Sequence, residues 1–274
     1  MQNGDKCENF IKIIILNLFR IFKIMRNLYL ILFVSLFFSC SDKKNSLSEE
    51  NLKGKVKSVD TYTYSAKEKF GEMVTDELQD RVNRKYNKDG NILESASYDE
   101  ERELEYKWKG KYNKDGNLIE SAFYDEEGEL TSKYKFKYDD GNMIGSTEYD
   151  DDGELTSKYK FKYDDEGNRI ENAEYNEEGE LTSKHKFKYD DEGNQIEIAS
   201  YDDEGELSYK LKYEYDDDGN RVEYKYISYD SDYRSTTTYK YKEYDKQGNW
   251  IEREEREERE EEKIKISKRK IKYY

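Results

Sequence analysis

Between residues 86 and 251 the chain alternates ring-bearing or aliphatic side chains with charged ones at a period of two. The stretch KYKFKY at Lys158–Tyr163 shows it most clearly, and it returns as KHKFKY at Lys184–Tyr189. In a strand, such alternation sends one kind of side chain to each face of the sheet. The pattern therefore predicts strands of about seven or eight residues and disfavours helices.

Turn signals divide the alternating stretches at regular intervals. Gly-Asn pairs begin at Gly90, Gly116, Gly141, Gly167, Gly193 and Gly219, with spacings of 26, 25, 26, 26 and 26, and a further pair begins at Gly248. An offset series, followed by Glu-Leu, lies at Gly128, Gly153, Gly179 and Gly205, with Arg102 in the glycine position of the first copy. Tyr-Asp or Tyr-Asn precedes most turns, which suits a type I turn ending in a left-handed glycine. A fixed period of this kind predicts a repeat architecture.

The turn at Asp164–Asn168 allows a register to be inferred. Tyr163 would face Arg169, Phe161 would face Glu171, and after the next turn Tyr175 would face Leu181. The ring face would then hold Tyr159, Phe161, Tyr163, Ala173, Tyr175 and Leu181. The lysine face would hold Lys158, Lys160, Lys162, Ile170, Glu174 and Thr182. Neither face is wholly apolar, whereas a sandwich needs an apolar face to bury.

We therefore predict an all-β protein, a repetitive antiparallel β-meander of roughly thirteen or fourteen strands. We expect a single-layer twisted sheet or solenoid that is held together by cross-strand pairs. The alternative is a sheet that coils until it forms a closed β-barrel.

The two ends of the repeat array differ from its middle. Leu52–Tyr64 alternates well enough to be an entry strand, with Leu78–Tyr86 as its partner. At the other end the acidic run EREEREEREEE at Glu252–Glu262 precedes the basic KIKISKRKIKYY. We expect a charged hairpin over 252–274, and a helix over Glu252–Glu262 is the alternative. The charges should discourage pairing with other sheets.

The N-terminal region has the layout of a secretory signal. After Met25 and Arg26 an apolar stretch, Leu28–Phe38, leads to Ser39 and Cys40. The longest uncharged run, 27–41, has 15 residues, fewer than the roughly 20 that a spanning helix needs. We expect residues 1–24 to be a mis-assigned upstream start, 25–39 a lipoprotein signal peptide, 40–51 a flexible tether that begins at a lipidated Cys40, and 52–251 the repeat domain.

The motifs YDEEGEL, YDDEGN and YDKQGNW resemble the YD repeats of the RHS-type family, in particular its small lipoproteins from Gram-negative bacteria. The resemblance covers roughly residues 52–274. It implies a β-repeat protein that is lipid-anchored to the outer membrane of the bacterial cell envelope. Large members carry a C-terminal toxin, and that function does not transfer because no such domain follows the repeats here. A weaker likeness is to MORN-type repeats, which would also be all-β.

Composition excludes several classes of function. The net charge of −16 argues against a nucleic-acid partner. His185 is the only histidine, and carboxylates are too frequent to single out a catalytic pair. The acidic triplets before Gly153 and Gly219 lack the ligand spacing of calcium loops. We expect no enzymatic activity, no cofactor and no metal site.

Columns of rings are the remaining candidates for function. They comprise Trp108, Tyr134, Phe136, Tyr138, Tyr159, Phe161, Tyr163, Phe187, Tyr189, Tyr213 and Tyr215. Their simplest role is to hold the sheet together. The expected function is that of a membrane-anchored structural or protein-interaction module with an unknown protein partner. The alternative is a glycan-binding module that uses these rings.

Lipidation can be tested directly. In a lipoprotein-competent host the protein should incorporate labelled palmitate, because the apolar stretch ends at Ser39-Cys40. Cys40→Ala should abolish the incorporation, whereas Cys7→Ala should leave it intact. Equal labelling of Cys40→Ala would refute the anchor.

Overall fold

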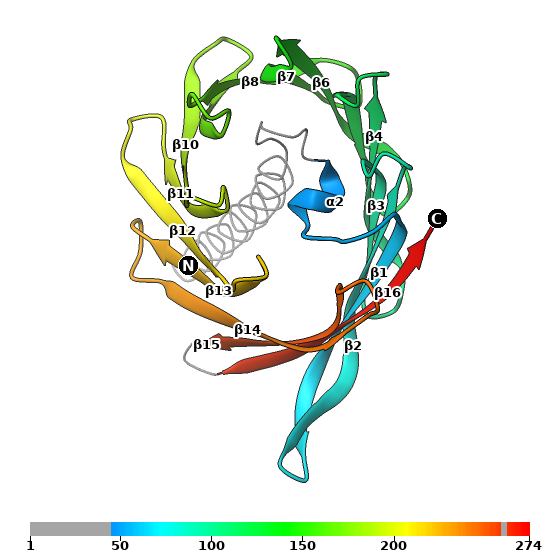
Figure 1. The fold of residues 1–274 in the computed structure, drawn as a ribbon. Helices are drawn as coiled ribbons and strands as arrows, with labels where there is room; N and C mark the ends of the chain where they lie inside the picture. Colours follow the sequence, from blue (N-terminus) through cyan, green and yellow to red (C-terminus); the bar gives the residue numbers. More distant parts are fainter. Residues whose placement is uncertain (1–44, 259–261) are drawn as a thin grey trace, which may run out of the picture. The chain divides into compact units, whose positions relative to one another are not determined.

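The strands of this protein close into a barrel. The computed structural model describes residues 45–258 and 262–274, so Cys40 and the predicted signal lie outside the described residues. Every strand pairs antiparallel with its sequence neighbours, and the last strand pairs with the first (Figure 1). After a short helix, α2 (Ser46–Glu49), the strands are β1 (Val56–Lys69), β2 (Glu72–Tyr86), β3 (Ile92–Tyr98), β4 (Leu104–Tyr112), β5 (Leu118–Tyr124), β6 (Leu130–Asp139), β7 (Asn142–Tyr149), β8 (Leu155–Tyr163), β9 (Arg169–Asn176), β10 (Leu181–Tyr189), β11 (Gln195–Tyr201), β12 (Leu207–Tyr215), β13 (Arg221–Ser228), β14 (Arg234–Tyr244), β15 (Trp250–Glu258) and β16 (Lys263–Tyr273).

The predicted antiparallel meander is confirmed, but the open twisted sheet or solenoid is wrong, and the closed barrel is the alternative that holds. An open meander leaves a row of unpaired N–H and C=O groups on each outer strand. Here the backbone N–H and C=O groups of β1 and β16 pair with each other along a ladder that runs from Val56↔Tyr273 to Ser65↔Lys265. The charges of the last strand therefore do not prevent pairing, because its partner is the first strand of the same chain.

The predicted register is partly right. Tyr163 pairs with Arg169, and Leu181 pairs with Tyr175, as expected. Phe161, however, pairs with Asn172 and not with Glu171, because a bulge lies between Lys162 and Tyr163.

That bulge corrects the assignment of faces. Tyr159 pairs with Glu174, so this glutamate belongs to the ring face. Ala173 and Tyr175 pair with Lys160 and Lys158, so they belong to the lysine face. A shift of one residue exchanges the two faces of a strand, and a bulge supplies such a shift at a single point.

The repeated turns carry their own hydrogen bonds. In the turn after β8, the Gly167 N–H donates to the Asp164 carbonyl at 3.1 Å, and the Asn168 N–H donates to Asp164 Oδ1 at 2.7 Å. Gly167 has φ +83°, which a glycine adopts without strain. Arg102 takes the same left-handed region with φ 71°. The motif Asp-x-x-Gly-Asn is therefore a self-contained turn.

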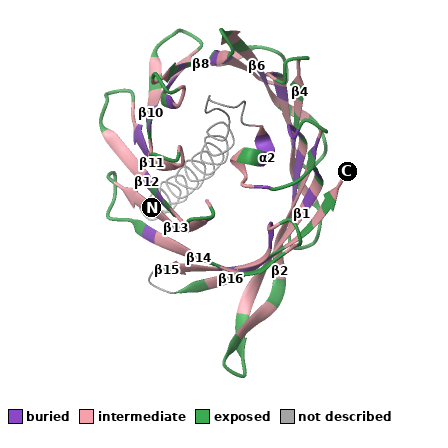
Figure 2. Cartoon of the chain, viewed as in Figure 1, coloured by how far each residue is buried: buried purple, intermediate pink, exposed green. Residues whose placement is uncertain are grey.

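Alternate residues of a closed barrel face its inside and its outside. Lys111, Lys162 and Lys188 keep 72, 69 and 67% of their side chains exposed, which places the lysine face outside. The ring face is the inner wall, where α2 and its flanking residues contact it. Buried residues occur in strands all around the barrel and not in one central layer (Figure 2).

The charged C-terminal stretch is strand on both sides of residues 259–261. Glu252, Glu255 and Glu257 of β15 pair with Lys268, Lys265 and Lys263 of β16. Opposite charges across a ladder stabilise a sheet. A helix over Glu252–Glu262 is excluded at least as far as Glu258, where β15 ends.

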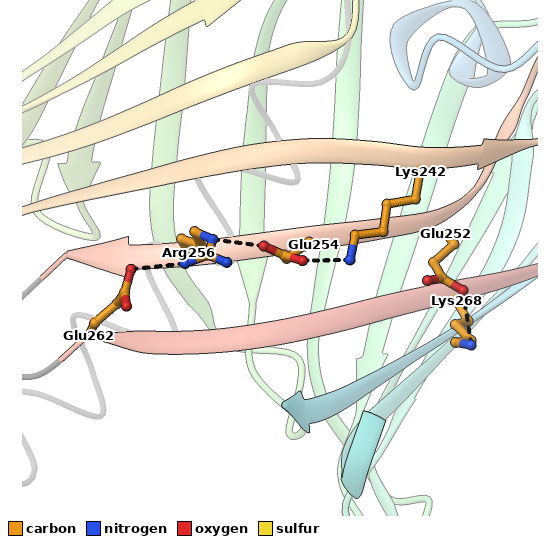
Figure 3. A network of polar contacts seen from close by, with 6 residues as sticks. All are labelled: Lys242, Glu252, Glu254, Arg256, Glu262 and Lys268. Atoms are coloured by element: carbon orange, nitrogen blue, oxygen red, sulfur yellow. Dashed lines mark hydrogen bonds and ion pairs between the residues drawn. The ribbon is translucent and has the colours of Figure 1, made fainter. Parts of the chain in front are cut away.

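Figure 3 shows how the outer charges of this region are linked. Glu254 accepts from Lys242 at 2.6 Å and from Arg256 at 2.7 Å, and Arg256 also reaches Glu262 at 3.4 Å. Lys268 contacts Glu252 at 2.9 Å. Acidic residues that look like helix formers in the sequence are thus held in a strand by cations of neighbouring strands.

Because β16 closes the barrel, its removal tests whether closure stabilises the fold. Truncation after Glu262 removes β16 and exposes two edges at once, those of β1 and β15. We expect the truncated protein to lose its cooperative thermal transition in circular dichroism and to aggregate in light scattering. Removal of Tyr274 alone is the control and should shift the melting temperature only slightly. A truncated protein that melts like the parent would contradict a stabilising role for closure.

Candidate functional site

The outer wall is a lattice of ion pairs. Glu120 of β5 bridges Lys111 of β4 at 2.5 Å and Lys133 of β6 at 2.8 Å. Hydrogen bonds from these two lysines lower the pKa of Glu120. Glu94 similarly lies between Lys85 and Lys107, at 2.8 and 3.7 Å. The same pairing recurs around the barrel because each repeat contains a lysine and a glutamate at equivalent positions.

The tyrosines that precede the Gly-Glu turns belong to this outer wall. A lysine Nζ lies 4.8–5.2 Å from the ring centroid in four successive copies. The pairs are Lys109–Tyr124, Lys135–Tyr149, Lys160–Tyr175 and Lys186–Tyr201. These rings cover lysine stems and attract their ammonium groups.

Six tyrosines of the inner wall act as staples. Each of these six hydroxyls donates to a backbone carbonyl of the neighbouring strand, 20 residues earlier, at 2.8–3.0 Å. Five of them directly precede a Gly-Asn turn, and the sixth, Tyr241, lies three residues before the turn tyrosine Tyr244. The donors and acceptors are Tyr112 to Ile92, Tyr138 to Leu118, Tyr163 to Met143, Tyr189 to Arg169, Tyr215 to Gln195 and Tyr241 to Arg221. Burial raises the pKa of Tyr163 and of Tyr189 to about 12.

The predicted ring columns lie together on the inner wall, where their rings pack against one another. All eleven predicted residues lie on the ring face, and Trp108, Tyr134, Phe161, Phe187 and Tyr213 are buried. Four rings gather at Tyr134, whose centroid lies 5.7, 6.5 and 6.2 Å from those of Phe123, Phe136 and Tyr159. The other six predicted rings are half-buried, so the rings of this wall mainly pack against one another.

His185 fills a ring position of the same wall. It is buried, and its ring centroid lies 6.4 Å from that of Tyr209. Burial and the neighbouring charge of Arg169 lower the pKa of His185 to about 4. The side chain is neutral at pH 7, as a substituted aromatic residue should be.

The inner wall also carries a set of arginines that were not among the candidates predicted from the sequence. Arg169 stacks on Phe161 and Phe187 at 5.2 and 4.9 Å, and Arg221 stacks on Tyr213 at 4.4 Å. Both arginines directly follow a Gly-Asn pair, where other copies have Ile92, Leu118 and Met143. That change of residue type at one repeat position was a signal available in the sequence.

Three further arginines gather on β2, β15 and β16. Arg84 pairs with Glu50 at 3.5 Å, and Arg253 pairs with Glu255 at 2.7 Å. Arg269 lies 3.5 Å above the ring of Trp250. It has no ion pair or hydrogen bond with any residue that the structure describes. Burial and the charge of Arg253 lower the pKa of Arg269 to about 9.

Residues 45–55, which we call the N-terminal strap, are bound to the turns at one end of the barrel. Asn45 Nδ2 donates to the Asp89 carbonyl at 2.7 Å, and Asn51 Nδ2 donates to the Asp218 carbonyl at 3.0 Å. Lys53 N donates to Asn249 Oδ1 at 2.7 Å. The described part of the predicted flexible tether, residues 45–51, is therefore ordered against two Gly-Asn turns, and Lys53 of the strap contacts a third.

Comparisons with known proteins support the fold. A porin-like protein from Bacteroides uniformis has a similar crystal structure, with 14% sequence identity, a TM-score of 0.53, and coverage of 79% of this chain and 98% of that chain. A DUF1329 family protein from Desulfovibrio piger has 10% identity and a TM-score of 0.26 over 80% of this chain and 86% of that one, a value too low to support an argument. A family model described as "Uncharacterised protein" matches residues 35–160, and no curated protein matches.

Within residues 45–258 and 262–274, no helix has the length and apolar character needed to cross a membrane. No group of three or more histidine, cysteine, aspartate or glutamate side chains in these residues is arranged to hold a metal ion.

The staples can be tested one hydroxyl at a time. Tyr189→Phe removes the bond to the Arg169 carbonyl and should lower the free energy of unfolding by about 1 kcal/mol. Tyr201→Phe is the matched control, since its ring lies on the outer wall beside Lys186. Urea unfolding at pH 7 measures both. Equal effects would mean that the inner hydroxyl has no stapling role.

The raised tyrosine pKa values predict a loss of stability in alkali. A tyrosine whose folded pKa is about 12 and whose ordinary pKa is 10.0 stabilises the fold fully below pH 10. The contribution falls as pH rises toward 12, because the unfolded chain ionises first. Tyr189→Phe should therefore show a shallower decline of unfolding free energy than the parent between about pH 10 and pH 12. Parallel curves would contradict the burial of this hydroxyl.

Proposed function

We propose that this protein is a lipid-anchored lipoprotein of the bacterial cell envelope whose barrel is a water-exposed structural and protein-interaction module. Its anchor is the lipid on Cys40, which holds the barrel at the outer membrane. The resemblance to small YD-repeat lipoproteins supports this proposal, as does the signal layout before Cys40. The likeness to a porin-like protein concerns the fold and does not require the barrel to cross the bilayer.

The main support for a water-exposed barrel is the charged composition of its outer wall. A membrane-spanning barrel needs an apolar outer band about 25 Å tall, and a lysine at its midplane costs about 2–4 kcal/mol. Here the outer positions of successive strands are lysines and glutamates, such as Lys111, Glu120 and Lys133. Several such residues per hairpin would have to be buried in lipid, so the outer wall fits water.

The aliphatic residues of the outer wall do not make up such a band. Leu93, Ile119, Ile144 and Ile170 are 38–42% exposed, and each follows a Gly-Asn pair by two positions. They form one row near the Gly-Asn turns. Leucines such as Leu181, opposite the outer Tyr175, form a second row near the Gly-Glu turns at the other end. Between the two rows the outer positions are lysines and glutamates, so no continuous apolar band of the height that a bilayer requires is present in the described strands.

The packing of the inner rings favours a protein-interaction module over the glycan-binding alternative. Stacking on a sugar needs exposed rings, and the rings of Trp108, Tyr134 and Phe161 are buried. The hydroxyls that could bond a sugar, such as that of Tyr163, are bonded to carbonyls. The charged outer wall is left as the broad accessible surface, and a protein partner would recognise it through ion pairs.

Extraction distinguishes an anchored barrel from a spanning one. In a lipoprotein-competent host the parent protein should sediment with membranes and be released by detergent. Cys40→Ala should be recovered in the soluble fraction without detergent, still folded by circular dichroism. The control is Cys7→Ala, which should behave like the parent. If folded Cys40→Ala stays with membranes after an alkaline carbonate wash, the barrel is embedded in the bilayer and the proposal is wrong.

A further inference from the structure

The inner wall at β15 and β16 carries one positive charge more than its partners balance. The charges of Arg253 and Arg84 lower the pKa of Arg269 there, and that of Glu50 raises it. Glu255 balances Arg253, and Glu50 lies nearest to Arg84, at 3.5 Å. Arg84 and Arg253 thus each have a carboxylate partner, whereas Arg269 has none among the residues that the structure describes. Asp80 and Lys265, which interact with Glu255, add one charge of each sign and leave this balance unchanged.

A buried cation without a carboxylate partner destabilises the fold unless another interaction offsets the free-energy cost. Like charges that share a partly desolvated site repel, and an unpaired buried cation costs free energy. The Nε–H groups of Arg253 and Arg269 are buried without a hydrogen-bond acceptor. The ring of Trp250 offsets part of the cost, since both guanidinium groups lie over it, at 4.5 and 3.5 Å. Stacking holds a guanidinium group in place and leaves its N–H edge available to an acceptor.

The cluster is partly accessible and well supported. The Arg253 side chain keeps 20% of its area exposed, and Arg269 is half-buried, although the Nε of each is buried. Barrels of sixteen or more strands generally leave a water-filled interior, which gives small solutes a route to this wall. Glu255 Oε1 accepts from both Arg253 and Ser267, at 2.7 and 2.6 Å, so the position of Arg253 is fixed from two strands.

We propose that Arg269, Arg253 and Trp250 form a binding site for a small oxyanion, a carboxylate or a phosphate group, on the inner wall of the barrel. Arg269 donates to the anion in the bidentate geometry that guanidinium groups prefer. Trp250 holds the guanidinium plane from behind. Glu50 of the N-terminal strap lies beside the site as a competing carboxylate, so it weakens the binding of a free anion.

Trp250 provides the readout, because the chain has only one other tryptophan, Trp108. The full chain is purified in detergent with Trp108→Phe, and Trp250 emission is followed while sodium phosphate or sodium acetate is added at constant ionic strength with sodium chloride. We expect a saturable change with at least one of the two oxyanions and none with chloride alone. The stronger of the two responses identifies a phosphate or a carboxylate as the preferred group.

The test is made specific by one variant that removes a positive charge from the site and another that removes a negative charge beside it. Arg269→Gln should weaken binding about tenfold or more, as expected for the loss of a charge-assisted hydrogen bond. Glu50→Gln should strengthen it, because a competing carboxylate is removed. Arg256→Gln is the matched control on the outer wall and should leave binding unchanged. If Trp108→Phe does not fold, the same variants are compared with both tryptophans present, since Trp108 contributes equally to each.

The absence of a saturable response to either anion would overturn the site, and so would an Arg269→Gln protein that binds as well as the parent. Both outcomes are independent of the anchor, because the titration is unaffected by whether Cys40 carries a lipid.

Discussion

The backbone ladder between β1 and β16 is the interaction on which this structure depends. In a meander whose strands pair only with their sequence neighbours, the first and last strands each keep one edge of unpaired N–H and C=O groups. Pairing Val59 with Ile271 and Thr61 with Arg269 satisfies both edges at once. It also turns one face of a meander into an inner wall and the other into an outer wall. Every assignment of a side chain to water or to the interior follows from that closure.

Within the closed ring, one short motif performs two tasks. Tyr-Asp before a Gly-Asn turn puts the ring inside, where its hydroxyl bonds the preceding hairpin. Tyr-Asp before a Gly-Glu turn puts the ring outside, against a lysine. The bulge in each repeat, such as that between Lys162 and Tyr163, produces this difference. Stability is therefore spread along the wall in small increments, as in other repeat proteins.

The charge distribution of the two walls sets the limits on function. Outside, lysines and glutamates pair across strands and remain near water, where such pairs are individually weak but do not repel. Inside, arginines lie on rings, and among the described residues Arg269 has no carboxylate partner. The outer wall has the composition of a water-exposed surface, whereas the described inner wall contains the cations whose arrangement led us to propose a ligand.

The sequence by itself determined the repeat strands, their order, the turn chemistry and the pairing of Tyr163 with Arg169, because these depend on neighbours within about 30 residues and on a period of two. It predicted roughly thirteen or fourteen strands where the described residues form sixteen, because the helix-forming residues of β15 gave no clear strand signal. It could not decide that the meander closes, since the pairing of β1 with β16 joins residues at opposite ends of the chain and leaves no local pattern. It also misplaced Glu174, because a one-residue bulge inverts the faces beyond it. The cluster of Arg84, Arg253 and Arg269 was hidden because only closure brings β15 and β16 to the hairpin of β1 and β2.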